Sequence, residues 1–147
     1  MKILQIAPPW ETVPPPAYGG TEAVVSLLTD SLVRRGHEVT LWASGDSTTS
    51  ARLRSIYPCS LRTADELKDR RCYEWVHISE ALKEARQFDI VHNHAGELAV
   101  AMSGLVDIPA LSTMHGQITP DAYFVWQHYR GYYNTISARQ YRTFPPP

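Results

Sequence analysis

Four short segments of this 147-residue sequence combine residue types that can bind or transform a small molecule. Two of them carry histidine: His92 and His94 are separated by one asparagine, and His115 is followed by Gly116. An imidazole changes charge near neutral pH, so it can donate a hydrogen bond to a substrate hydroxyl or offset developing charge. The other two segments are Gly19-Gly20-Thr21-Glu22 and Ser137-Ala138-Arg139-Gln140.

The histidines allow more than one interpretation. Residues two apart on a strand share a face, so at least one of His92 and His94 can reach a pocket, whereas His92 can equally be half-buried and hydrogen-bonded within a sheet. A His-x-His pair can also bind zinc with His115 as the third ligand, although few carboxylates are well placed to help. For His115 the alternative to a role in a site is a histidine that caps a helix or is simply exposed.

The pair Gly19-Gly20 precedes a segment with helical spacing. Glycine lets the backbone turn tightly and approach a ligand, and the amides at a helix N-terminus favour an anion. An isolated glycine pair is also compatible with an ordinary loop. Neither GxGxxG nor a Gly-Lys-Ser/Thr loop is present, so the fingerprints of nicotinamide-dinucleotide and ATP sites are missing.

The elements that must position these residues alternate along the chain. Apolar runs of strand length occupy residues 2–7, 38–43, 89–93, 110–114 and 133–137, and helical spacing is found at residues 21–35, 74–87, 96–105 and 121–130. We expect Thr21 to cap the first helix and Gly36 to follow its last turn. In the second helix, Val76, Ala81, Leu82 and Ala85 are expected to face inward. Residues 45–72 have a weak pattern, for which we expect a short strand at 55–57 and a helical turn at 64–68.

Alternating strands and helices predict one α/β domain, a Rossmann-like, doubly wound parallel sheet with helices on both faces. In such sheets ligands bind outside the carboxyl ends of the strands. All four polar segments follow strands at that edge, so we expect them to form a single site.

The composition agrees with an ordinary globular domain, with 44% hydrophobic and 20% charged residues. The formal net charge of -1 gives no indication of a nucleic-acid partner. Residues 52–71 are the most basic stretch, but they also hold acidic residues and therefore predict a solvated face. The alternative for this stretch is a contact with lipid headgroups, helped by Tyr73 and Trp75.

The two cysteines, Cys59 and Cys72, lack CxxC spacing, so we expect free thiols in a reducing cytoplasm. The first apolar run is too short for a signal peptide, and no run approaches the roughly 20 apolar residues of a membrane span. The last four residues, 144–147, are expected to be extended or part of a linker, as if the chain were cut at a domain boundary.

Six segments together resemble the amino-terminal domain of retaining glycosyltransferases of family 4, which have the GT-B fold. They are MKILQIAPPW, YGGTE, LVRRGHEVTLWASGDS, FDIVHNH, STMHG and TISARQ, in the family's order and roughly its spacing over residues 1–140. The resemblance does not extend to residues 45–72, a region that varies with the acceptor in such enzymes.

The resemblance implies a nucleotide-sugar transferase with two Rossmann-like domains and a cleft between them. Residues 1–147 would be the acceptor-side domain, and a carboxyl-terminal domain absent from this sequence would hold the nucleotide. His115 would approach the transferred sugar, as the catalytic residue, and Gly19 and Gly20 would lie near the donor diphosphate and the acceptor. The other substrate-binding residues implied are Glu22, His94, Gly116, Ser137 and Gln140.

The implied reaction is transfer of a glycosyl unit with retention, from a UDP- or GDP-sugar to a sugar, lipid-linked sugar or small-molecule acceptor. It needs no metal or other cofactor, and the isolated domain would be inactive alone. Two alternatives stay open: a non-catalytic module that binds a sugar or nucleotide and regulates a partner, and a metal-dependent hydrolase built on His92, His94 and His115.

Overall fold

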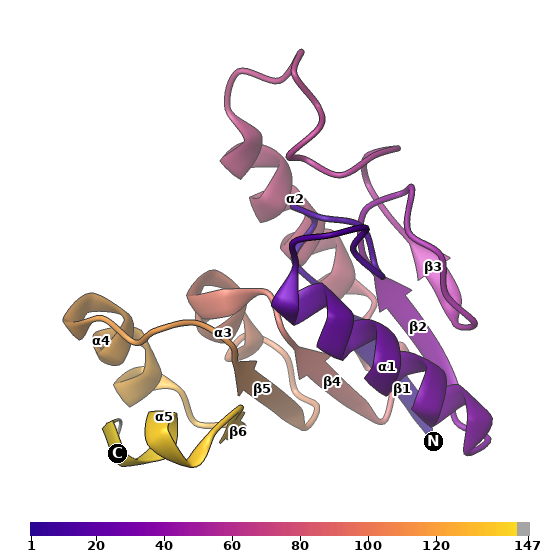
Figure 1. Cartoon of the computed structure of the whole chain (residues 1–147). Coiled ribbons are helices and arrows are strands. Elements are labelled where there is room, and N and C mark those ends of the chain that lie inside the picture. The colour runs from indigo at the N-terminus through magenta and orange to yellow at the C-terminus, as the bar shows by residue number, and fades with distance from the viewer. Residues whose placement is uncertain (144–147) are drawn as a thin grey trace.

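The computed structural model describes residues 1–143, which form a six-stranded sheet whose paired strands are all parallel (Figure 1). The strands are β1 (Lys2–Ile6), β2 (Glu38–Trp42), β3 (Arg52–Arg54), β4 (Ile90–Asn93), β5 (Ala110–Met114) and β6 (Tyr132–Thr135). Their order across the sheet is β3-β2-β1-β4-β5-β6, which confirms the Rossmann-like prediction. The prediction for residues 144–147 lies outside the described residues.

Helices cover both faces of this sheet. They are α1 (Gly20–Arg34), α2 (Arg70–Lys83), α3 (Gly96–Ser103), α4 (Pro120–His128) and α5 (Ala138–Thr143), with a 3-10 turn, η1 (Ala85–Gln87), after α2. Neighbouring residues of β2 show how the faces divide: Leu41 packs with Val25 of α1, whereas Trp42 packs with Ile78 of α2. Side chains alternate along a strand, so α1 and α2 lie on opposite faces.

The central strands are buried because they are nearly continuous apolar runs. Leu4 and Ile6 are fully buried and belong, with Val91 of β4, to the core beneath α2. A second cluster joins Met114 at the end of β5 to Trp126 of α4. This packing fixes the ends of β1, β4 and β5 relative to one another.

Two expectations for the middle of the chain were wrong. The third strand is Arg52–Arg54, paired with β2 in the register Leu41↔Leu53, and not residues 55–57. This is an edge strand, and the exposed arginines on either side of Leu53 leave little apolar signal. The expected turn at 64–68 is present, because the Leu67 amide donates to the Ala64 carbonyl at 3.2 Å, but it does not continue into a helix. The following helix, α2, starts at residue 70 and not 74, because the Asp69 side chain caps it by accepting from the Arg71 amide.

Helix faces also differ from expectation. Thr21 does not cap α1, which begins at Gly20 after an N-cap glycine, Gly19. Val76 is half exposed, so its expected inward position was wrong, whereas Ala81 and Leu82 are buried as predicted. The apolar spacing of α1 does not mark its buried face either: Glu22, Val25 and Thr29 are buried, while Val24 and Leu27 are exposed.

The predicted glycine after α1 is confirmed, because Gly36 has a φ of 84° just beyond the last turn. Cys59 and Cys72 are free thiols, as expected. Among residues 1–143, no helix combines the length and apolar character that a membrane span needs.

Candidate functional site

The carboxyl ends of β1, β4 and β5 border a cavity of about 400 Å³. Strand order reverses between β1 and β4, so their following loops lead to opposite sides and leave a crevice where ligands of such sheets bind. The cavity is lined by Pro8, Thr21, Glu74, Trp75, His94, Ala95, Gly96, Glu97, Leu98, Thr113, Met114, His115, Gly116, Gln117, Ile118 and Trp126.

The structure brings three of the predicted site residues, His94, His115 and Gly116, into this cavity. Ser137 and Gln140 lie with His115 and Gly116 around an adjoining hollow of about 460 Å³. The two sides of that hollow are joined, because the Gln140 side-chain amide donates to the Gly116 carbonyl at 2.7 Å.

Gly19 and Gly20 border a different hollow, beside α1, and not the cavity itself. Gly19 has a φ of 140°, and a Cβ there would lie 2.6 Å from the Cβ of Pro15, so only glycine fits. In the described part of the chain, no atom lies within 4 Å of a Cβ placed on Gly20, which leaves the start of α1 open to an approaching group. Glu22 is buried just below, and burial raises the pKa of its carboxyl group.

A chain of hydrogen bonds links His115 to the interior of the sheet. His94 is almost fully buried, and its Nε2 donates to the side-chain carbonyl of Gln5, at 2.9 Å. Its Nδ1 lies 2.8 Å from Nε2 of His115. Because a neutral imidazole has one donor and one acceptor, His94 accepts through Nδ1 and His115 donates through Nε2. The Nδ1 atom of His115 is then the acceptor that this ring offers to a ligand.

His92 has a structural environment, as one of the two interpretations predicted. Thr113 donates to the Asn134 side-chain oxygen at 2.7 Å, so it accepts from Nε2 of His92, also at 2.7 Å. The His92 ring packs against that of His94, with 4.1 Å between centroids. His92 therefore supports the histidine beside the cavity but does not line it.

All three imidazoles are shifted toward the neutral form. Burial, followed by repulsion from His115, lowers the pKa of His92 to about 4. Burial and the two neighbouring histidines hold the pKa of His94 well below its usual range, and burial lowers that of His115. At neutral pH the site therefore offers hydrogen bonds and not fixed positive charge.

The zinc alternative finds no support in this geometry. Both nitrogens of His94 bond to protein atoms, and Nε2 of His92 faces Thr113. Within residues 1–143, no group of three or more His, Cys, Asp or Glu side chains is placed to hold a metal ion.

Two cavity residues, Glu74 and Trp75, are not among the site residues that the sequence pattern predicts. They lie near the start of α2, which leads into β4. A helix that precedes a parallel strand begins at the carboxyl edge of the sheet, so the position of α2 before β4 is the signal that its first turns lie near the site. Gln5 was also missed, although a polar residue inside a buried apolar strand is an available signal.

Comparisons with known proteins agree with this architecture. The family model described as Glycosyltransferase Family 4 matches residues 18–145. The crystal structure of AviGT4, a glycosyltransferase involved in avilamycin A biosynthesis, is similar with a TM-score of 0.53 and 27% sequence identity. The alignment covers 79% of this chain but 32% of that structure, so this chain spans about a third of its length. No curated protein matches the sequence significantly.

The resemblance to family 4 found from the sequence motifs is thereby confirmed, and the parallel sheet with its helices matches the fold of a GT-B glycosyltransferase. Because the family model spans nearly all of the sequence, this chain belongs to glycosyltransferase family 4.

Proposed function

We propose that this domain is the acceptor-side half of a retaining glycosyltransferase, which moves a glycosyl unit from a UDP- or GDP-sugar to an acceptor hydroxyl. One observation carries the proposal: His115 lies at the cavity where strand order reverses, held by the buried His94. A second Rossmann-like domain would bind the nucleotide, and the longer AviGT4 structure supports this view.

The chemistry requires a departing nucleotide diphosphate to be stabilised while the acceptor hydroxyl is held close to an oxocarbenium-like centre. The open N-terminus of α1 at Gly20 suits the first task, because helix dipoles favour anions there. His115 suits the second, since its Nδ1 can accept a hydrogen bond from a sugar hydroxyl. The nucleotide sugar is a co-substrate, and we assign the reaction no metal or organic cofactor.

We place this reaction in the cytoplasm, and the two free cysteines support that placement. The partners are then small molecules and the nucleotide-binding domain, with no nucleic acid and no membrane contact. The acceptor hydroxyl would belong to a sugar, a lipid-linked sugar or a small molecule.

The proposal is tested with His115→Ala in the longest natural form of the protein, assayed with a panel of UDP- and GDP-sugars. We expect turnover to fall by about 10²-fold or more, because a contact made chiefly in the transition state is lost. His128→Ala is the matched control, since His128 is exposed on α4 and outside the cavity. The anomeric configuration of the product, read by NMR, tests retention.

Full activity in His115→Ala would remove His115 from the site. Tight binding of a sugar or nucleotide with no turnover under any donor would favour the non-catalytic module.

A further inference from the structure

Two side chains of α2 line the cavity that contains His115. Trp75 is 51% exposed, although tryptophan is usually well buried. Glu74, the residue before it, is half-buried at the same cavity. Nothing in the fold requires a large aromatic ring in water at this position, since neighbouring Val76 is exposed as well and α2 is anchored by Ile78, Ala81 and Leu82.

Glu74 is held in place by a tryptophan from another loop. Nε1 of Trp10, in the loop after β1, donates to one carboxylate oxygen of Glu74 at 2.8 Å. A carboxylate has acceptor positions on both oxygens, so this bond orients the group and leaves acceptor capacity for a ligand. Burial raises the pKa of Glu74, as expected for a carboxyl group partly removed from water.

The segment that precedes α2 fixes this arrangement. The amides of Leu61 and Arg62 donate to the carbonyls of Pro9 and Trp10, at 2.9 and 3.1 Å. Arg62 also pairs with Glu11 of the same loop. The loop carrying Trp10 is therefore fastened to residues 61–62 on one side and to Glu74 on the other.

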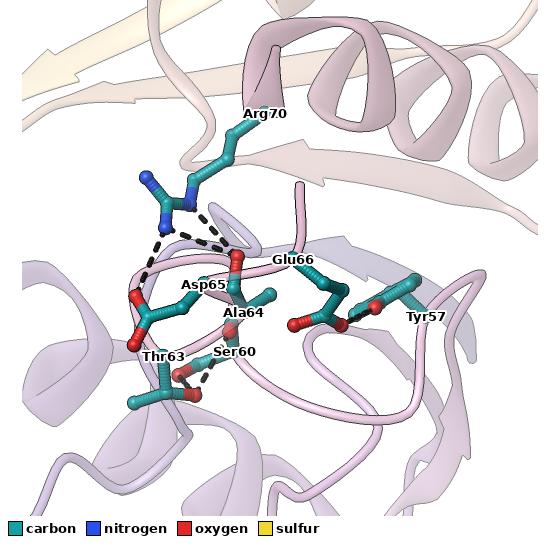
Figure 2. Close-up of polar contacts among 7 residues, drawn as sticks. All are labelled: Tyr57, Ser60, Thr63, Ala64, Asp65, Glu66 and Arg70. Atoms are coloured by element: carbon teal, nitrogen blue, oxygen red, sulfur yellow. Dashed lines mark hydrogen bonds and ion pairs between the residues drawn. The ribbon is translucent and has the colours of Figure 1, made fainter. Parts of the chain in front are cut away.

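Figure 2 shows how the rest of this segment is tied together. The Arg70 guanidinium, in the first turn of α2, donates to the Ala64 carbonyl and to Asp65, and Tyr57 donates to Glu66. Residues 57–69, which have no regular secondary structure, are thus held in place by polar contacts among themselves and with Arg70. Glu74 and Trp75 lie on a helix whose preceding segment is held in place by hydrogen bonds, so their positions at the cavity are fixed.

The two side chains together select for a particular ligand chemistry. An aromatic face carries a partial negative charge, which attracts the weakly positive C–H groups on one face of a sugar ring. An oriented carboxylate accepts strong hydrogen bonds from sugar hydroxyls. The same carboxylate repels a nucleotide diphosphate, whereas the start of α1 favours an anion. We propose that Trp75 and Glu74 form the acceptor subsite, and that the acceptor is a neutral sugar or glycoside whose ring stacks on Trp75.

The assignment of the bound sugar as the acceptor rests on the proposed function, but binding of a sugar at Trp75 and Glu74 can be measured without any donor. The 147-residue chain is titrated with methyl glycosides of common hexoses and their disaccharides, and indole resonances are followed by NMR. We expect Trp75→Ala to weaken binding by roughly tenfold or more, as for other aromatic anchors, and Trp75→Phe to recover part of the loss. Glu74→Gln keeps an acceptor for Trp10 and should weaken binding several-fold.

Matched controls come from the same helix. Val76→Ala changes an exposed neighbour of Trp75, and Glu80→Gln removes a carboxylate that pairs with Lys83. Both should leave glycoside affinity unchanged, and thermal unfolding should show that every variant is folded.

The subsite is overturned if no glycoside in the panel binds, or if Trp75→Ala and Glu74→Gln bind as the unaltered chain does. It is also overturned if UDP or GDP displaces the glycoside from Trp75. Failure of the proposed function would be seen separately, as the absence of glycosyl transfer with every donor. That result would not affect a glycoside site that has been measured by binding. Conversely, transfer with an unchanged acceptor KM in Trp75→Ala would remove the subsite alone.

Discussion

Acid should destabilise this domain in part through a histidine outside the cavity. His77 of α2 is fully buried, and its Nε2 donates to the Ala7 carbonyl at the start of the loop after β1, at 3.1 Å. Among residues 1–143, its Nδ1 has no hydrogen-bond partner, and its ring packs against that of Trp42 in a T-shaped arrangement, with 5.5 Å between centroids. This environment favours the neutral ring, and burial lowers the pKa of His77 from 6.5 to about 4.

The size and sign of the effect follow from that difference. Between pH 6.5 and about 4 the unfolded chain binds a proton at this residue that the folded chain does not bind. The free energy of unfolding therefore falls as the pH drops from 6.5 to about 4. The contribution of His77 to this fall is about 3 kcal/mol over the whole range. Above pH 6.5 both states are neutral and the contribution is fully retained.

Other groups titrate in the same range, so a variant is needed to isolate His77. The lowered pKa values of His92, His94 and His115 act in the same direction. The raised pKa values of Glu22 and Glu74 act in the opposite direction, because the folded state takes up their protons first as pH falls. His77→Phe keeps a ring against Trp42 but does not titrate, and it leaves these other contributions in place.

The assay is urea unfolding of the unaltered chain and of His77→Phe at several pH values from neutral to 4. At neutral pH the variant should be less stable by about 1 kcal/mol, because the bond to Ala7 is lost. On acidification this deficit should shrink and then reverse, as the unaltered chain loses about 3 kcal/mol that the variant retains. Replacing the exposed His128 by Phe controls for loss of a histidine as such. Parallel stability curves for the unaltered chain and His77→Phe would refute the reasoning.

Three further outcomes are expected. Trp42→Ala should lower the free energy of unfolding by roughly 3–5 kcal/mol, because Trp42 is 6% exposed in the core beneath α2; a small change in the urea midpoint would contradict this. The 147-residue chain alone should show no turnover above blank with UDP- or GDP-sugars, because the proposed nucleotide-binding residues lie in a second domain. Robust multiple turnover by this chain alone would disprove that proposal. Elemental analysis should find no stoichiometric transition metal, since His94 uses both ring nitrogens on protein atoms; one zinc per chain that chelator removes with loss of function would overturn it.

Sequence patterns predicted the interior strands better than the edge strand β3. β1 and β2 are apolar runs bounded by loops, and burial on both faces makes such runs conspicuous. β3 has only Leu53 as an apolar residue, because an edge strand is exposed and its flanking arginines remain in water. Its place depends on pairing with β2, which is a long-range contact that local composition does not encode.

The candidate site divides in a similar way. His94 and His115 were expected to meet because each ends a parallel strand, and β4 and β5 are neighbours in the sheet. Glu74 and Trp10 are 64 residues apart, and their contact depends on the path of residues 45–72. Turns and side-chain hydrogen bonds hold that segment in place. The residues that form these bonds are not spaced with the regular period of a helix or a strand, so the sequence pattern does not predict them.

The chemistry open to His115 depends on a residue that the motif around it does not contain. From the sequence alone, its ring could donate to a substrate hydroxyl or offset charge. In the folded chain, the carbonyl of Gln5 takes the proton of His94 Nε2, which makes Nδ1 of His94 an acceptor for His115. The single N–H of the neutral His115 ring therefore donates to His94 within the protein. Burial lowers the pKa of His115, which favours the neutral ring near pH 7. What it can offer the cavity is the lone pair of Nδ1, which suits a ligand that donates, such as a sugar hydroxyl, and not a phosphate oxygen. Gln5, the polar residue in the first strand, thus determines which kind of hydrogen bond His115 can offer to a ligand.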